Sequence, residues 1–373
     1  MLRKTISIIF VILSVGVFQS FSTNDIDITV LTCSPGKETY SAWGHSAIRV
    51  VDKKANIDVV YNFGLFDFST PNFYPKFIKG RLQYKLGAEY TRQFYQQYFR
   101  EDRQIIEQKL NLSEEEKIKI IQKLQYLYRP ENRYYLYRFA GKNCTTEIRD
   151  LLLENVETDF QHIPTDKTIR DQLNEYLQNR LWLRFSMSLI MGYKIDRKID
   201  SFDSMFLPDY LCVGLRNINT DNGKLVIEEN TFNQVYDGTK AYPIYKNPLL
   251  ILSILFLIML IINHNYIQFP ILLIIGLTGL VIFILSLITE HPELQFNLNS
   301  LWINPLYLIL VFLKSDTKFR KIIAIVLQVM LIAMIPIWLF NVQYFDWAYL
   351  PVFLMLILFN FRTQYPKKKL HLI

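Results

Sequence analysis

Hydrophobic residues are spread unevenly along the chain, and the change near residue 247 predicts two structural parts. Before this point apolar and polar residues are mixed, whereas after it apolar stretches dominate. These stretches lie near 248–263, 269–288, 301–314, 322–340 and 345–361. A membrane-spanning helix needs about 20 mostly apolar residues, a length that some of the stretches reach and that the third falls short of. We therefore expect residues 247–373 to form an all-α transmembrane domain of about five helices.

The basic residues of this half gather in two places. The loop 314–321 carries four Lys and Arg residues, and the tail 362–369 carries four more. Loops that stay in the cytoplasm are enriched in Lys and Arg. Five spans that start outside leave both clusters in the cytoplasm, together with the C-terminus, whereas four or six spans would separate them. The aromatic residues expected at the membrane–water interfaces are Trp302, Tyr344 and Trp347.

Residues 1–22 have the pattern of a secretory signal. Arg3 and Lys4 precede an apolar run, 6–18, that is too short to cross a bilayer with ease, and small residues follow where a cleavage site favours them. An uncleaved N-terminal anchor is the alternative. In either case we expect residues 23–246 to be exported.

The exported part shows patterns of both strands and helices. Runs of β-forming residues between turn residues predict strands at 26–32, 46–51 and 59–66. Helical periodicity predicts helices at 113–126, 145–155 and 168–185, of which the first opens with the capping sequence Ser-Glu-Glu-Glu. The stretch 215–236 is expected to form a β-hairpin with its turn at 221–223. These elements together predict one α+β domain.

Composition and charge narrow the function classes. The chain has 51% hydrophobic and 20% charged residues, and 41 Lys and Arg against 34 Asp and Glu give a net charge of +7. The two basic clusters account for that excess, so the charge does not indicate a nucleic-acid partner. The sequence contains no Gly-rich phosphate loop and no His-x-x-x-His or Cys-x-x-Cys spacing. We therefore expect no nucleic acid, no metal and no cofactor.

Three cysteines, Cys33, Cys144 and Cys212, lie in the exported part. Export favours disulfides, but an odd number leaves at least one thiol over. Cys144 follows Asn143 at the start of the helix predicted at 145–155. There, free N–H groups and the helix dipole lower the pKa of a thiol and can hold an oxyanion. The alternative is a buried cysteine that packs as a small hydrophobic residue.

His45 opens a predicted strand directly after Gly44. In that position it can face a cleft and act as the base that a thiol nucleophile needs; the alternative is a structural histidine bonded to a loop carbonyl. His162 lacks such a context and is expected in a surface loop. A third group would orient the imidazole, and the next strand offers Asn62 and Asp67. We prefer Asn62, for which an ordinary strand-edge amide is the alternative.

These candidate residues occur in a characteristic order. Gly-His-Ser at a strand start (44–46), an aromatic second strand, and Asn-Cys-Thr at a helix start (143–145) resemble the circularly permuted papain-like (NlpC/P60-related) superfamily. The segments 31–36, 43–46, 61–68 and 291–299 resemble more closely the DUF4105 family, which includes the Lnb-type lipoprotein N-acyltransferases. The resemblance implies a permuted papain-like α+β domain followed by a multi-span membrane domain.

The resemblance also implies a reaction. Cys144 would attack an acyl ester of a membrane phospholipid while His45 takes the thiol proton, so that a thioester forms. The α-amine of a diacylglyceryl-cysteine lipoprotein would then receive the acyl chain. The implied partners are a phospholipid donor, a diacylated lipoprotein acceptor and the membrane. The implied location is a bacterial inner membrane, with the catalytic domain in the periplasm.

Further residues are expected to contact the substrates. Three of them adjoin the catalytic candidates, namely Trp43, Ser46 and Asn143. His291 lies in an outer loop, 290–304, that would close over the site and line the lipid entry; the alternative is an interfacial loop residue. Arg81, in the basic aromatic stretch 79–86, would meet phosphate headgroups. The alternative for this stretch, which we favour, is a solvated helix face.

Two other function classes remain open. One is a membrane-anchored cysteine amidase or endopeptidase that acts on cell-wall peptides. Soluble papain-like relatives catalyse this type of reaction. The other is a non-catalytic, membrane-anchored binding module in which Cys33, Cys144 or Cys212 form a disulfide. A free Cys144 is required by both enzyme classes, so the pairing of the thiols separates them from the binding module.

Overall fold

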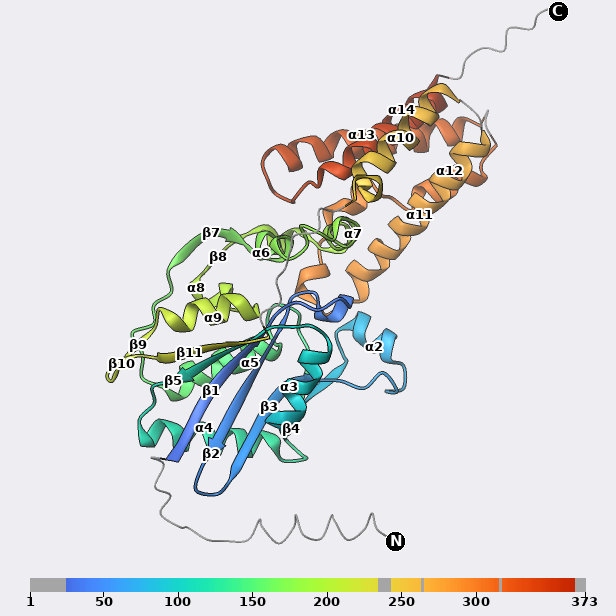
Figure 1. Cartoon of the computed structure of the whole chain (residues 1–373). Coiled ribbons are helices and arrows are strands. Elements are labelled where there is room, and N and C mark those ends of the chain that lie inside the picture. The colour runs from blue at the N-terminus through green and yellow to red at the C-terminus, as the bar shows by residue number, and fades with distance from the viewer. Residues whose placement is uncertain (1–24, 234–242, 263–264, 315–316, 366–373) are drawn as a thin grey trace, which may run out of the picture.

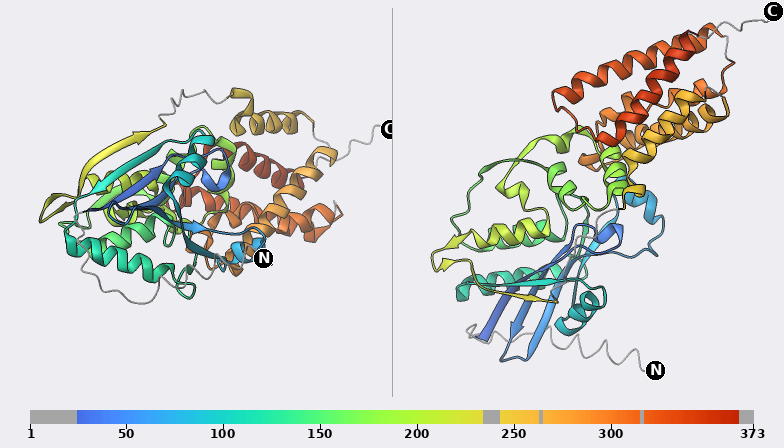
Figure 2. Two further views of the ribbon diagram at one scale, coloured as in Figure 1. Left: turned by 60° about the horizontal axis from the view of Figure 1, so that its bottom comes forward. Right: turned by 45° about the horizontal axis from the view of Figure 1, so that its top comes forward.

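An antiparallel sheet forms the centre of the N-terminal part of the chain (Figure 1). The computed structural model describes residues 25–233, 243–262, 265–314 and 317–365. In these ranges the chain forms an N-terminal α/β domain and a C-terminal region of apolar helices, which lies beyond one end of the sheet (Figure 2). The expected signal at 1–22 lies outside the described residues.

Seven strands pair in the order β11-β5-β1-β2-β3-β4-β6, and each neighbouring pair is antiparallel. These strands are β1 (Ile26–Cys33), β2 (His45–Asp52), β3 (Ile57–Leu65), β4 (Gln83–Tyr90), β5 (Ile105–Leu110), β6 (Tyr134–Leu136) and β11 (Val226–Phe232). The first three confirm the expected strands. Sequence patterns missed β4 to β6, because they contain few β-branched residues and form through pairing with their neighbours.

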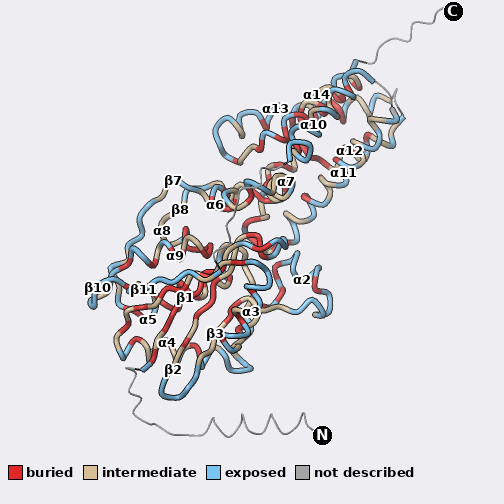
Figure 3. Tube along the Cα trace, viewed as in Figure 1, coloured by how far each residue is buried: buried red, intermediate tan, exposed pale blue. Residues whose placement is uncertain are grey.

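Helices cover both faces of the sheet. The helices of this domain are α2 (Phe73–Lys79), α3 (Thr91–Arg100), α4 (Glu114–Tyr128), α5 (Cys144–Asn155), α6 (Ile169–Glu175), α7 (Leu181–Ile190), α8 (Ser201–Ser204) and α9 (Pro208–Arg216). Alternate strand residues point to opposite faces. Ile28 and Ile48 pack under α4, α5 and α9, whereas Leu31 and Val60 pack under Phe94 of α3. The central strands are accordingly buried along their length (Figure 3).

Two expected helices are confirmed, and their caps explain where they begin. The Ser113 side chain accepts from the backbone N–H of Glu116, whose own side chain accepts from the N–H of Ser113, and α4 follows. Asn143 caps α5 in the same reciprocal way, with Thr146 as its partner. The second cap puts Cys144 at the first position of a helix.

The single helix expected at 168–185 is wrong. The chain forms α6 and α7 with a turn between them. The two halves pack against different cores: Leu173 lies in a cluster of the N-terminal domain, whereas Leu189 packs among the C-terminal helices. A straight helix cannot bury both, so the chain turns.

The hairpin expected at 215–236 is confirmed only in part. The turn before Gly223 does join two strands, but they are the short β9 (Asn219–Thr220) and β10 (Gly223–Lys224). Leu215 still belongs to α9, and β11 leaves the hairpin to pair with β5 at the edge of the main sheet. Its partner is far away in sequence, so local patterns did not reveal it. A further two-stranded ladder joins β7 (Pro164–Thr168) and β8 (Lys198–Asp200).

The C-terminal region is helical. Its helices are α10 (Pro248–Ile261), α11 (Asn265–Ile288), α12 (Leu306–Phe312), α13 (Lys318–Leu339) and α14 (Leu350–Gln364). Two helical segments of the described residues, Tyr266–Ile288 and Lys318–Leu339, are long and apolar enough to cross a membrane. With 14 residues, α10 rises about 21 Å, less than the roughly 30 Å of a bilayer's hydrocarbon core.

The segment expected to form one helix over 301–314 forms a shorter helix instead. A short 3-10 turn, Leu298–Leu301, comes first, and α12 begins only at Leu306. Pro305 has no N–H to continue a helix from the preceding turn. Asn304 starts the new helix instead, because its side-chain oxygen accepts from the N–H of Leu306 at 2.9 Å.

Trp302, expected at the level of the membrane–water interface, does not face outward. It is fully buried among the C-terminal helices, and its ring packs near those of Trp338 and Tyr349 at 5.9 and 5.3 Å. Its indole N–H donates to the side chain of Asn299 at 2.9 Å. Trp302 is thus a core residue of the helical region, whereas Trp347 is largely exposed.

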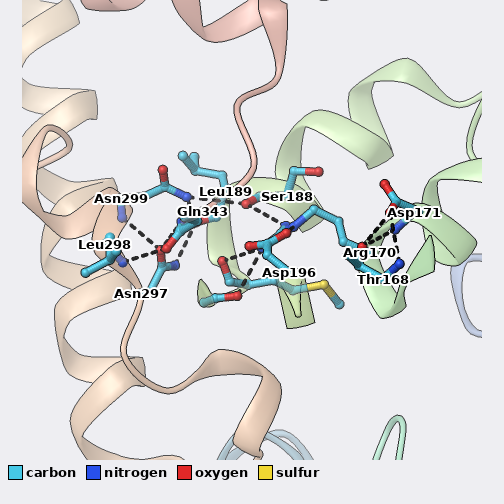
Figure 4. A network of polar contacts seen from close by, with 12 residues as sticks. Thr168, Arg170, Asp171, Ser188, Leu189, Asp196, Asn297, Leu298, Asn299 and Gln343 are labelled. Atoms are coloured by element: carbon cyan, nitrogen blue, oxygen red, sulfur yellow. Dashed lines mark hydrogen bonds and ion pairs between the residues drawn. The ribbon is translucent and has the colours of Figure 1, made fainter. Parts of the chain in front are cut away.

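A polar network joins the two parts of the chain (Figure 4). Arg170 on α6 is buried and pairs with Asp196 at 2.5 Å, and its guanidinium also donates to main-chain carbonyls near the end of α7. From the other side, Asn297 donates to the carbonyl of Leu189 at 2.8 Å and accepts from Gln343 at 3.0 Å. The free carbonyls at the end of α7 are thus bonded by both parts, which holds the helical region against the domain.

Candidate active site

Three of the predicted residues meet at the end of the sheet that faces the helical region (Figure 1). His45 is the first residue of β2, Asn62 lies near the end of β3, and Cys144 is the first residue of α5. Because β2 and β3 are antiparallel, the start of one lies beside the end of the other. Since α5 packs across these strands, its N-terminus brings Cys144 to the same place.

The histidine contacts both of the other residues. The Nε2–H of His45 donates to the side-chain oxygen of Asn62 at 2.7 Å. The same ring lies beside Cys144, since both residues border Gly64, and each group changes the pKa of the other. Asn62 therefore holds the tautomer whose other nitrogen, Nδ1, can take the thiol proton. Asp67, the alternative third group, is exposed and bonds to Ser69 of its own turn.

The pair is electrostatically coupled. Burial by itself would raise the pKa of the Cys144 thiol, but the charge and hydrogen bond of His45, with smaller contributions from Ser46 and Thr145, lower it to about 7. Burial by itself would lower the pKa of His45, but Cys144 and then Asn62 raise it. Each group favours the charged form of the other, so a thiolate–imidazolium pair is populated near neutral pH.

The helix N-terminus supplies one free donor at the sulfur. The side-chain oxygen of Asn143 accepts from the N–H groups of Thr145 and Thr146 at 2.8 and 3.0 Å. The N–H of Cys144 donates to no group among the described residues, so it can hold an oxyanion. The expectation that several N–H groups of this turn are available is corrected, because Asn143 occupies two of them.

Gly64 lies beside Cys144 and His45. It has a φ of +96°, and the β3–β4 register shifts between Asn62 and Leu65. A Cβ at Gly64 would lie 3.6 Å from Cβ of Cys144 and 3.7 Å from Cε1 of His45. The glycine lets the strand bulge beside Cys144 and His45. A glycine within a predicted strand was the sequence signal for this bulge, and sequence analysis missed it.

Aromatic rings surround the pair. Tyr98 lies parallel to the ring of His45, with centroids 6.4 Å apart. On the other side Tyr84 stacks on Tyr137 at 4.4 Å. Burial raises the pKa of both of these hydroxyls, and the charge of Cys144 raises it further. Both tyrosines therefore stay neutral, and they pack with Tyr135, which adjoins the same core cluster as Cys144.

The residues expected to bind substrate beside the pair have structural bonds. Asn143 is buried, and its amide also donates to the carbonyls of Phe139 and Phe206, so we assign it to capping α5 rather than to binding substrate. The Ser46 hydroxyl is buried against that of Thr145 at 3.0 Å, whereas its backbone bonds to the sulfur of Cys144.

Trp43 is half-buried next to the site. Its indole N–H donates to the carbonyl of Leu173 at 3.4 Å, and its ring packs edge-on against Phe139. Phe139 belongs to the turn that precedes Cys144, and Leu173 belongs to α6. Trp43 therefore links this turn to α6. Its exposed part remains available to a bound molecule.

His291 and Arg81 lie at the junction with the helical region. His291 is buried, and its Nε2–H donates to the carbonyl of Phe77 on α2 at 2.9 Å. Arg81 is exposed and pairs with Glu290 at 2.6 Å. The helix face favoured for the stretch 79–86 is wrong: the stretch leaves α2 and forms β4, where Tyr84 pairs with Tyr135 of β6 and is buried.

All three cysteines are free. Cys33 and Cys212 are buried, and burial raises the pKa of both thiols. The disulfide expected for a binding module is therefore wrong, because none of the three thiols is paired with another. His162 lies in a surface loop, as expected, bonded to Asp200 at 2.7 Å. Within the described ranges, no group of His, Cys, Asp or Glu side chains is arranged to hold a metal ion.

Comparison with known families assigns both parts of the chain. Residues 17–175 match the family described as the Lnb N-terminal periplasmic domain, and residues 243–369 match the one described as the Lnb transmembrane domain. Searches of curated proteins and of solved structures found no match. The two family matches together cover more than half of the chain and agree with its two structural parts. The chain therefore belongs to the Lnb-type family and is a membrane protein with a periplasmic N-terminal domain and a transmembrane domain.

Proposed function

We propose that the protein is a lipoprotein N-acyltransferase. It moves an acyl chain from a membrane phospholipid, through a thioester on Cys144, to the α-amine of a diacylglyceryl-cysteine lipoprotein. The observation that carries the proposal is the contact of Cys144, His45 and Asn62 at the end of the domain that faces the transmembrane helices (Figure 1). A nucleophile at the membrane surface suits a reaction in which both substrates are lipids.

The first half-reaction forms the thioester. The Cys144 sulfur bonds to the ester carbonyl carbon, and His45 holds the thiol proton. The backbone N–H of Cys144 stabilises the oxyanion. When the ester C–O bond breaks, His45 gives the proton to the leaving oxygen, and a lysophospholipid departs.

The second half-reaction consumes the thioester. The acceptor's amine nitrogen bonds to the carbonyl carbon, and His45 takes a proton from it. The C–S bond then breaks and restores the Cys144 thiolate, so the imidazolium and thiolate are again paired. Two products leave in turn, which is ping-pong kinetics.

The finer fold assignment is part of the proposal. We infer that the N-terminal domain is a permuted papain-like (NlpC/P60-like) domain. Two features support this: the histidine strand precedes the cysteine helix in the chain, and that helix packs on an antiparallel sheet.

We also propose five spans, with the C-terminus in the cytoplasm of a bacterial inner membrane. Two loops of the transmembrane domain contact the periplasmic domain, through Glu290 with Arg81 and through Asp346 with Arg184 at 3.0 Å. Both loops therefore lie on the periplasmic side in this proposal. Five alternating helices then leave the basic loop and tail on the other side.

Intact mass of the detergent-purified protein, incubated with a defined phospholipid, tests the function. Wild type should gain an acyl chain that hydroxylamine removes. His45→Ala should gain none, and Cys144→Ser should form no thioester. Addition of a diacylated lipopeptide should then discharge the chain onto the peptide amine. A folded wild type that gains no chain would count against the acyltransferase and favour the cysteine amidase.

A further inference from the structure

The short helix α2 carries its apolar side chains on the outside. Tyr74, Phe77 and Ile78 are spaced i, i+3 and i+4, so they share one helix face, and they are 69%, 41% and 38% exposed. Only Phe73 points into the domain. In a water-soluble domain such a stripe would face the core. An exposed stripe therefore indicates a surface that meets something apolar.

The position of α2 identifies the apolar surroundings as lipid. The carbonyls of Ile78 and Lys79 accept from the hydroxyl of Thr289 at 2.9 Å and from the N–H of Glu290 at 3.0 Å. These two residues directly follow α11, which ends at Ile288. The helix α2 is thus bonded to the end of a transmembrane helix, and the two lie side by side in Figures 1 and 2.

The exposed face of α2 adjoins exposed apolar side chains at the end of α11. Leu287 and Ile288 in the last turn of α11 are 69% and 43% exposed, as expected for side chains that face lipid. Two lysines of α2, Lys76 and Lys79, stand in its last turn, where they can meet lipid phosphates. Aromatic side chains with basic neighbours are typical of the interfacial layer of a bilayer.

A line of rings leads from this surface to the candidate site. Phe68 is 60% exposed and packs on Phe73 of α2 and on Phe66, at 4.9 and 5.0 Å. Phe66 stacks on Tyr84 at 5.1 Å, and Tyr84 stacks on Tyr137. Tyr84 also lies 6.4 Å from the ring of Tyr135, which packs against the same core cluster as Cys144. These contacts make one continuous line of aromatic rings from α2 to the core beside Cys144.

We propose that α2 and Phe68 lie in the outer leaflet and that the donor phospholipid enters the site across them. Its acyl chain follows the rings of Phe66, Tyr84 and Tyr137, which leads its ester to Cys144. This inference rests on the proposed acyl transfer and adds the route and the membrane-binding element. It also explains why a short helix with an outward apolar face is bonded to the end of α11.

The test compares two donors with the full-length protein. One is a long-chain phosphatidylethanolamine and phosphatidylglycerol bilayer in nanodiscs; the other is dihexanoyl phosphatidylcholine, supplied as monomers to protein in detergent. The test variant is Tyr74→Ser with Ile78→Ser. The matched control is Tyr90→Ser with Ile57→Ser, since these side chains are 67% and 46% exposed at the far end of the sheet.

The test variant should form the thioester with the bilayer lipid at least about tenfold more slowly, because each apolar side chain withdrawn from lipid loses burial worth roughly that factor. With the monomeric lipid its rate should match wild type, and the control should match wild type with both donors. An equal loss of rate with the monomeric lipid would mean that α2 only supports the fold of the site. An equal loss of rate in the control variant would mean that α2 has no specific role in lipid entry. Either result overturns the proposal.

A second readout does not depend on catalysis. Benzoylphenylalanine at position 74, irradiated in nanodiscs, should crosslink to phospholipid, and at position 90 it should not. Crosslinking to a second copy of the chain would show that position 74 contacts protein rather than lipid, which would overturn the inference. If position 74 crosslinks to lipid but wild type forms no thioester with either donor, the proposed function fails while the membrane contact of α2 stands.

Discussion

At the scale of single residues, the site depends on one proton shared between two groups. Asn62 orients His45, and His45 sets the state of Cys144. The sulfur also receives the Ser46 backbone bond, while Thr145 lies 3.8 Å away. Burial by itself opposes ionisation of the thiol. The partners of Cys144 outweigh this effect and lower its pKa.

The pH dependence of alkylation measures this coupling. Iodoacetamide labelling of Cys144, followed by mass, should increase with pH around a midpoint near 7, because the thiolate reacts and the pKa of Cys144 is lowered to about 7. In His45→Ala the midpoint should rise to at least the ordinary thiol value of about 8.5, because burial then acts without the imidazolium. Cys33 and Cys212 should stay unlabelled in the folded protein, since both are buried. Equal midpoints in wild type and His45→Ala would contradict the pairing.

Gly64 offers a second prediction at this scale. Gly64→Ala should lower stability by about 1 kcal/mol, because an L-residue is strained at positive φ, and it should slow thioester formation about tenfold by shifting the strand beside Cys144 and His45. Gly223→Ala is the matched control: Gly223 has a φ of +100°, but a Cβ there would contact nothing. It should lose similar stability and keep the wild-type rate. Thermal unfolding and intact mass measure the two quantities, and equal rates in the two variants would exclude a role of Gly64 in the site.

At the scale of elements, the turn between β6 and α5 is held from outside its own domain. The N–H of Ala140 donates to Oε1 of Glu293 at 2.8 Å. Glu293 belongs to the transmembrane domain and is itself held through its carbonyl, which accepts from Gly192 at 2.8 Å. This turn ends at Asn143, the cap of α5. The position of Cys144 therefore depends on a residue of the other domain.

Substitution of Glu293 tests this dependence. Glu293→Ala leaves the N–H of Ala140 without its acceptor, which costs about 1–3 kcal/mol, and should slow thioester formation with either lipid donor. Glu293→Gln keeps an oxygen at the same place and should restore most of the rate. Rates from intact mass and unfolding temperatures of both variants check the prediction. Equal losses in the two variants would show that charge, rather than the hydrogen bond to Ala140, matters at this position.

At the scale of the whole molecule, the two domains form one continuous structure. The helix α7 belongs to the periplasmic domain in sequence order, but Phe185 and Leu189 pack in the core of the transmembrane helices. The polar network of Figure 4 surrounds the end of this helix and includes the buried pair Arg170–Asp196. The junction thus fixes the position of the candidate site relative to the transmembrane helices.

Separation of the domains should expose α7. The fragment 23–246 should aggregate in the absence of detergent, because Phe185, Leu189 and their neighbours lose their apolar contacts. Phe185→Ser with Leu189→Ser in the same fragment should restore a soluble monomer. Gel filtration with light scattering distinguishes these outcomes. A soluble, monomeric, unaltered fragment would show that the junction is not an obligatory part of the fold.

Local patterns along the chain predicted much of this protein. The alternation of residues in β1 to β3, the capping sequence of α4 and the apolar stretches of the transmembrane domain each act over a few neighbouring residues. The same holds for Cys144 at a helix start and His45 at a strand start. Such features are visible in a sequence because the interactions that cause them are short in range.

The tertiary structure decided what depends on residues far apart in the chain. The strands β4 to β6 and β11, the break between α6 and α7, and the burial of Trp302 follow from packing against distant partners. The choice of Asn62 over Asp67 likewise required the distance to His45. The capping role of Asn143 became clear only from its side-chain oxygen, which accepts from the N–H groups of Thr145 and Thr146. The sequence by itself determined which residues can do chemistry and which helices are apolar. Only the folded chain determined which of them meet, because contact between distant residues is a property of the packed core and not of any local pattern.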